Sequence, residues 1–164
     1  MNSRHVPSLE LCQEFDQRCK DKGIVVPMTE YYWIGDSIKN MSLVSIQNTY
    51  KITGSPFDGN MQQDEYLFCF PAPLVSEQGE WLGKSITNKD EQGDYMIDVT
   101  TYQDASGLWF CVRADQQGSP AAHTRYIGRR EYRDECDRTE ANARQKMLNY
   151  LIAEGIITTL CQPT

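Results

Sequence analysis

The 164-residue sequence has no long hydrophobic run, no closely paired cysteines and only two histidines. No apolar stretch approaches the roughly 20 residues that a membrane-spanning helix needs. Residues 1–7 also lack the hydrophobic core of a signal peptide. We therefore expect a soluble, cytoplasmic protein that does not bind membranes.

The six cysteines are scattered through the chain, without a C-x-x-C pair or a neighbouring histidine cluster. Structural zinc sites use such closely spaced ligands. The pattern predicts six reduced thiols, no metal site and no cofactor.

Catalytic motifs are also missing. The glycines are isolated and no G-x-x-x-x-G-K is present, which excludes a phosphate-binding loop of that type. His123-Thr124 resembles half of a two-histidine phosphoesterase motif, but the second half is absent. We favour a chain without catalytic residues; a small enzyme of nucleotide metabolism is kept as an alternative.

The formal net charge of −7 disfavours general affinity for nucleic acid, because phosphates are bound through lysine and arginine. It fits a basic partner better. The alternative is that the acidity only maintains solubility.

The last third of the chain contains the clearest helix, predicted over residues 137–157. Asp137 and Glu140 have the spacing of a capping box, and Gly155 is placed to end the helix. An apolar stripe at helical spacing is predicted to face a core: Ala141, Arg144, Met147, Leu148, Leu151 and Ile152. The opposite side is predicted to face solvent: Arg138, Asn142, Gln145, Lys146 and Asn149.

The other segments alternate between helical and strand-like patterns. We predict a helix between Ser8 and Gly23, a short helix at 74–82, and strands at 30–34, 44–52, 66–70, 95–102, 108–112 and 123–127. The turn at 104–107 predicts an antiparallel hairpin. Together these predict one α+β domain spanning residues 1–164. Its mostly antiparallel sheet of about five strands would carry an N-terminal and a C-terminal helix packed on one face.

Basic and aromatic residues alternate in one segment of this otherwise acidic chain. The segment contains Arg125, Tyr126, Arg129, Arg130, Tyr132 and Arg133. Arginine and tyrosine together suit phosphate contact and base stacking, and they are also enriched in protein interfaces. A third interpretation is a solvated surface on which these arginines pair with Glu131, Asp134 and Glu135.

A second aromatic cluster is Tyr31-Tyr32-Trp33, in the strand predicted at 30–34. Strand alternation sends Tyr32 to the face opposite its two neighbours. If that ring is exposed it is a candidate anchor for a partner; the alternative is that it packs in the core.

Four segments carry a resemblance to known sequences. They are Ser8-Leu9-Glu10-Leu11-Cys12, Thr29-Glu30-Tyr31-Tyr32-Trp33, Phe70-Pro71-Ala72-Pro73 and the stretch TEANARQKMLNYLI at 139–152. The last is similar to a recurrent E-A-x-A-R-x-K-M-L-x-Y-L-I ending. In these segments the chain resembles a group of small uncharacterised proteins encoded by phages and prophages of gut bacteria; residues 39–63 and 114–133 depart from that pattern. The resemblance implies a phage origin and brings no catalytic residues.

Small size, acidity, the lack of a catalytic motif and this resemblance lead to one hypothesis. The chain would be a phage-encoded accessory protein that binds a host macromolecule in the host cytoplasm, as a monomer or homodimer. Its partner would be a host protein such as a CRISPR effector or another defence protein, which it would inhibit. The alternative is a nucleic-acid- or nucleotide-binding protein that uses the segment from Arg125 to Arg133.

Overall fold

The computed structural model describes residues 5–46, 68–83, 85–90, 93–115 and 132–161. In chain order the elements are α1 (Leu9–Lys22), β1 (Tyr31–Gly35), β2 (Met41–Ser45), β3 (Phe68–Pro71), α3 (Val75–Leu82), β4 (Ser85–Asp90), β5 (Gly93–Gln103), β6 (Trp109–Asp115), β7 (Tyr132–Asp137) and α4 (Glu140–Ala153). The predicted α+β class is confirmed. No helix in these ranges is long and apolar enough to cross a membrane.

The strands form two antiparallel sheets instead of one. The small sheet has the order β2-β1-β3, and the large sheet has the order β4-β5-β6-β7. Residues after Pro71 leave the small sheet and enter α3, which leads on to the large sheet. The predicted single sheet of about five strands is therefore wrong in its number of sheets, although its antiparallel character is confirmed.

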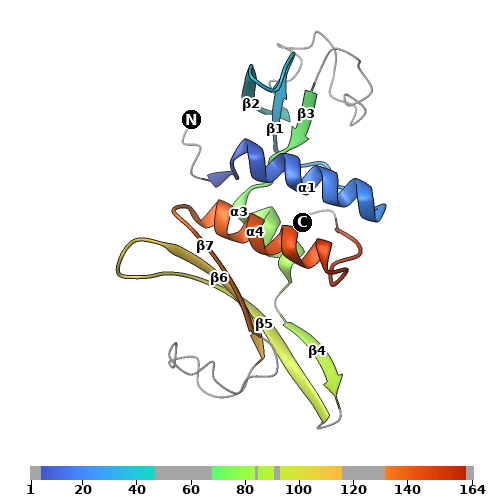
Figure 1. The fold of residues 1–164 in the computed structure, drawn as a ribbon, viewed down its shortest axis with the longest axis vertical. Helices are drawn as coiled ribbons and strands as arrows, with labels where there is room; N and C mark the ends of the chain where they lie inside the picture. Colours follow the sequence, from blue (N-terminus) through green and yellow to red (C-terminus); the bar gives the residue numbers. More distant parts are fainter. Residues whose placement is uncertain (1–4, 47–67, 84, 91–92, 116–131, 162–164) are drawn as a thin grey trace.

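The helices lie between the two sheets. From top to bottom, Figure 1 shows the small sheet, then α1, then α3 with α4, then the large sheet. Consistent with this order, α1 contacts β3 and α4, whereas α4 contacts α3, β6 and β7. The terminal helices are confirmed, but they are stacked between two sheets and do not share one face of a single sheet.

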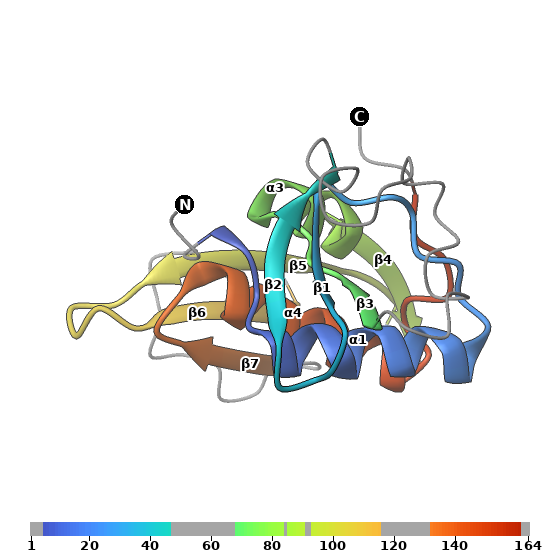
Figure 2. The same cartoon turned by 90° about the horizontal axis from the view of Figure 1, so that it is seen from above.

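Helices α1 and α4 run side by side in the same direction (Figure 2). Both end in the same way, with a glycine in the left-handed region: Gly23 has φ 67° and Gly155 has φ 72°. After each glycine the next N–H returns to a carbonyl in the last turn, from Ile24 to Cys19 (2.8 Å) and from Ile156 to Leu151 (2.9 Å). This is the Schellman arrangement, which favours glycine because it lacks a Cβ.

The main core fills the space between these helices and the large sheet. The rings of Phe15 in α1 and Trp81 in α3 stack with centroids 5.8 Å apart. Helix α4 contributes four fully buried apolar side chains, namely Met147, Leu148, Leu151 and Ile152. Burial of each is worth about 1.5–3 kcal/mol, so the apolar stripe predicted for this helix is confirmed at its large positions.

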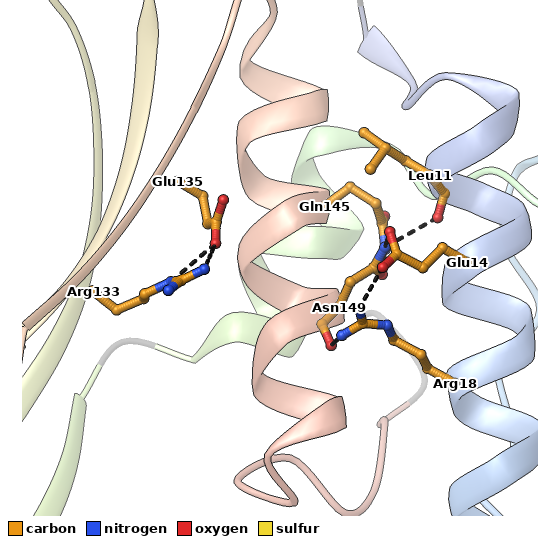
Figure 3. Close-up of polar contacts among 7 residues, drawn as sticks. All are labelled: Leu11, Glu14, Arg18, Arg133, Glu135, Gln145 and Asn149. Atoms are coloured by element: carbon orange, nitrogen blue, oxygen red, sulfur yellow. Dashed lines mark hydrogen bonds and ion pairs between the residues drawn. The ribbon is translucent and has the colours of Figure 1, made fainter.

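Gln145 and Asn149 were expected to face solvent, but they are 0% and 2% exposed. The prediction was wrong because α4 is packed on two sides. With Gln78 of α3, they form a hydrogen-bonded series that we call the amide chain. Gln78 Nε2 donates to Gln145 Oε1, and Gln145 Nε2 donates to Asn149 Oδ1, both at 2.9 Å. Asn149 Nδ2 then donates to Glu14 Oε2 (3.1 Å) and to the Leu11 carbonyl (3.2 Å) of α1 (Figure 3).

Several elements or their boundaries differ from the sequence predictions. Thr139, not Asp137, is the N-cap of α4, and its side chain accepts from the Asn142 N–H. Residues 132–137, for which no strand was predicted, form strand β7. Strand β4 was not predicted, and β2 begins at Met41, three residues before the expected strand; the remainder of that strand and the strand predicted at 123–127 lie outside the described residues.

Candidate functional site

Tyr32 is buried in the small sheet and is 6% exposed. Its hydroxyl oxygen accepts the Thr29 backbone N–H at 3.0 Å, and burial raises the pKa of the phenol. The ring packs with Ile34, Val44 and Cys69 on one face of the sheet. Tyr32 is therefore a core residue, and the prediction that it anchors a partner is corrected.

The predicted arginine and tyrosine segment falls largely outside the described residues. This applies to Arg125, Tyr126, Arg129 and Arg130. The two members that are described, Tyr132 and Arg133, are the first residues of β7, and strand alternation places them on opposite faces of the large sheet. They do not form one surface together.

Arg133 points to the inner face, towards α4. Its Nε donates to Glu135 Oε1 at 3.0 Å, and one terminal nitrogen reaches the same oxygen (Figure 3). The guanidinium carbon also lies 4.3 Å from the centroid of the Tyr150 ring of α4. Hydrogen bonding to the Glu135 carboxylate raises the pKa of Arg133 above its ordinary value. This arginine is already engaged by its own chain, which matches the ion-pair interpretation better than phosphate contact.

The outer face of the large sheet, turned away from α4, is acidic and aromatic. Strand register defines it by three rows: Tyr102, Phe110 and Cys136; Thr100, Val112 and Asp134; Asp98, Ala114 and Tyr132. We call these positions the outer face. No lysine or arginine stands at any of these described positions.

The outer face is accessible at its margins and closed in its centre. Tyr132 is 41% exposed, and Thr100, Asp134 and Cys136 are exposed, whereas Val112 and Ala114 are buried. At one end Tyr102 and Phe110 stack with centroids 5.3 Å apart and ring planes 9° apart. The face therefore combines carboxylates with a fixed aromatic pair.

The turn that joins β5 and β6 extends beyond the rest of the described chain in both views (Figures 1 and 2). The Asp104 carboxylate holds it by accepting from the Ser106 hydroxyl (2.7 Å), the Ser106 N–H (2.9 Å) and the Leu108 N–H (3.0 Å). The hydrogen bond from the Ser106 hydroxyl, followed by those from the backbone, lowers the pKa of Asp104. The hairpin thus presents a fixed, ionised carboxylate next to the aromatic pair.

Sequence reasoning missed the outer face, although a signal for it was present. The alternation in the strand predicted at 95–102 placed Ile97, Val99 and Thr101 on one side, so Asp98, Thr100 and Tyr102 had to share the other. The contribution of β7 could not be found in this way, because its residues are mostly charged and show no alternation of apolar and polar side chains.

The cysteines do not form a nucleophilic or metal-binding site in the described part of the chain. All six are free; Cys136 and Cys161 are exposed, and the other four are buried. Burial raises the pKa of Cys19 and Cys69 to about 12 and that of Cys111 to about 11, and it raises the pKa of Cys12 further still. The buried thiols therefore stay protonated and unreactive near neutral pH. No group of three or more potential metal ligands occurs among the described residues.

Comparison with known proteins finds no matching family model, no matching curated protein and no matching solved structure. The resemblance to phage proteins remains a prediction from the sequence.

Proposed function

We propose that this chain is a non-enzymatic binding protein whose outer face docks on a basic surface of a partner protein. The observation that carries the proposal is the charge of that face: Asp98 and Asp134 stand beside exposed or half-exposed aromatic rings, with no basic residue at the described positions. The ionised Asp104 extends the same charge to the tip of the hairpin.

Charge and aromatic rings have separate roles in such a contact. Complementary charge speeds the encounter and excludes acidic partners. Large rigid aromatic side chains supply buried area at small entropic cost, as at protein interface hot spots. Tyr102 and Phe110 are already held by their mutual stacking, so little conformational freedom remains to be lost when a partner covers them.

A partner with a nucleic-acid groove fits this chemistry. Such grooves are lined with lysine and arginine because they hold phosphates. An acidic face that occupies the groove would compete with the nucleic acid. This supports the more specific hypothesis, a phage-encoded inhibitor of a CRISPR effector or of another defence nuclease in the host cytoplasm.

The experiment begins with a pull-down by the tagged protein from nuclease-treated lysate of a gut bacterium that carries CRISPR and other defence systems. The captured protein is then purified, and its affinity is measured for two double variants. The test variant, Asp134→Lys with Thr100→Lys, changes the outer face at exposed positions. The control, Asp21→Lys with Ser42→Lys, makes the same change in net charge at exposed positions of α1 and β2.

We expect the test variant to lose at least about tenfold in affinity, equivalent to about 1.4 kcal/mol, and the control to bind like the unmodified protein. The unmodified protein should also reduce interference against a targeted plasmid. Equal losses in both variants would show that only net charge matters and would remove the outer face as the site. Undiminished interference with excess protein would remove the inhibitor hypothesis.

A further inference from the structure

A hollow of about 680 Å³ lies between α3 and β5, outside the outer face described above. Small residues line it on the side of α3: Ser76 and Gly79 share one helical face at a spacing of three, and Gly83 follows the helix as its C-cap. Leu82 and Val99 supply apolar lining. This volume is within the range of small-molecule sites.

Arg144 of α4 reaches into this hollow. Its Nε and one terminal nitrogen both donate to Glu140 Oε1, at 2.9 and 2.6 Å, which fixes the plane of the guanidinium. Its side chain is 21% exposed. No hydrogen bond from the other terminal nitrogen, NH1, to any described residue is present. The guanidinium is therefore oriented by Glu140 while NH1 keeps two N–H groups for another acceptor.

Gly79 explains how the guanidinium comes to lie there. A Cβ at this position would stand 2.8 Å from Arg144 NH1, closer than such contacts occur. Glycine inside a helix is less favourable than alanine by about 1 kcal/mol, and α3 has only eight residues. The glycine leaves the space that NH1 occupies at the wall of the hollow.

The lining of the hollow also includes the opposite charge. Glu80, the next residue of α3, also lines the hollow, and Ser76 and Thr101 add hydroxyl groups. A site with an oriented cation donor, a neighbouring carboxylate and an apolar lining is complementary to a ligand that carries both charges. A simple anion would be repelled by Glu80 and Glu140, and a simple cation would leave the N–H groups of Arg144 NH1 without an acceptor.

We propose that this hollow binds a free α-amino acid with an apolar side chain. The ligand carboxylate would accept from Arg144 NH1, its ammonium would donate to Glu80, and its hydrocarbon part would cover Leu82 and Val99. This site is separate from the outer face, so either proposal can fail without the other.

The test is an NMR titration of the isotope-labelled full chain with L-leucine and L-phenylalanine, compared with their N-acetyl derivatives and their amides. Each derivative removes one of the two ligand charges and keeps the side chain. We expect saturable shifts of the backbone signals of Gly79, Gly83 and Thr101 with the free amino acids at concentrations up to about 10 mM, and at least about tenfold weaker binding of both derivatives.

Three single variants locate the site. Gly79→Ala places a methyl group against NH1, and Ser76→Leu fills the hollow from an exposed position; each should reduce affinity at least about tenfold. Glu80→Gln should abolish the preference for the free amino acid over its N-acetyl form. Ser42→Leu, a matched change on β2, should leave binding unchanged. The spectrum of each unliganded variant shows whether it is folded.

Three results would overturn the proposal. One is the absence of saturable shifts with either amino acid, and a second is equal binding of the free amino acid and its two derivatives. Binding that persists unchanged in both Gly79→Ala and Ser76→Leu, with both variants folded, would place the ligand elsewhere and have the same consequence.

Discussion

Replacement of Asn149 by alanine tests whether the amide chain contributes to stability through its connected hydrogen bonds. Asn149 makes three of them: it accepts from Gln145 and donates to Glu14 and to the Leu11 carbonyl. Its loss leaves Gln145 Nε2 without that acceptor in a fully buried position. A buried polar group that loses its partner costs about 1–3 kcal/mol.

The two acceptors on α1 are nearer to solvent, since the Glu14 side chain is 42% exposed. Loss of the hydrogen bonds to these two acceptors should therefore cost less stability than loss of the buried hydrogen bond from Gln145. We therefore expect Asn149→Ala to lower the free energy of unfolding by about 2–4 kcal/mol. The control, Gln17→Ala, removes an exposed amide that donates only to Asp21 within α1, and it should change stability by less than about 0.5 kcal/mol.

The orientation of the amide chain gives a sharper version of the test. Ionised Glu14 can only accept, so the Asn149 amide must turn its NH₂ group towards it, and each preceding amide is oriented in turn. The series ends at Gln78 Oε1, which is buried and has no hydrogen-bond partner among the described residues. Replacing all three amides together, as Gln78→Met, Gln145→Met and Asn149→Leu, removes that unpaired atom along with the hydrogen bonds.

We expect the triple variant to cost less than about 1.5 kcal/mol, because buried polar networks replaced by apolar side chains of similar volume are often close to neutral. Urea unfolding followed by circular dichroism gives the change in unfolding free energy of both variants, provided that the dependence of this free energy on urea concentration is the same as for the unmodified protein. A triple variant less stable than Asn149→Ala would refute the reasoning, since it would show that the amides stabilise the fold beyond satisfying one another.

Three further predictions concern single side chains. Burial raises the pKa of Glu77, although the backbone N–H groups of Leu74 and Glu30 oppose the shift; the folded state thus binds this proton more tightly. Relative to Glu77→Gln, the unmodified protein should gain stability as the pH falls from neutral through the raised folded pKa towards the ordinary value of 4.5. Urea unfolding over this pH range measures the difference. A relative loss of unfolding free energy at the lower pH would contradict the raised pKa. Maleimide should label Cys136 and Cys161 in the native chain and the other cysteines only after unfolding, as mass spectrometry can show; native labelling of a buried thiol would disprove the packing. Tyr32→Phe should cost about 1–3 kcal/mol by leaving a buried N–H unpaired, without altering partner affinity; weaker binding by a folded variant would restore this residue as a contact.

The elements that could be predicted are those whose signals are local. The stripe of Met147, Leu148 and Leu151, followed by Gly155, specified α4 from spacing and from a residue suited to positive φ. The turn centred on Asp104 specified the β5–β6 hairpin through its own hydrogen bonds. Neither depends on distant parts of the chain.

The features that were missed depend on contacts between distant segments. Gln145 reads as a solvent-facing residue unless it is known that α3 supplies a buried amide opposite it. The sequence of β7 has the composition of a polar linker. It forms a strand because it pairs with β6, and not because of its own hydrophobicity. The division into two sheets has the same origin, since periodicity identifies strands but not their neighbours.

The burial of α4 bears on where recognition can occur. This helix carries the clearest pattern in the sequence, yet none of its residues from Glu140 to Ala153 is exposed. A helix enclosed by α1, α3 and the large sheet cannot present a face to a partner without unfolding the core that contains Met147 and Leu151. Apart from the side chain of Arg144, which reaches the hollow beside α3, recognition by the folded chain must therefore use other elements. Among the described surfaces, the outer face of the large sheet combines one sign of charge with ordered aromatic rings. It is therefore the surface at which substitutions should first be tested for their effect on partner binding.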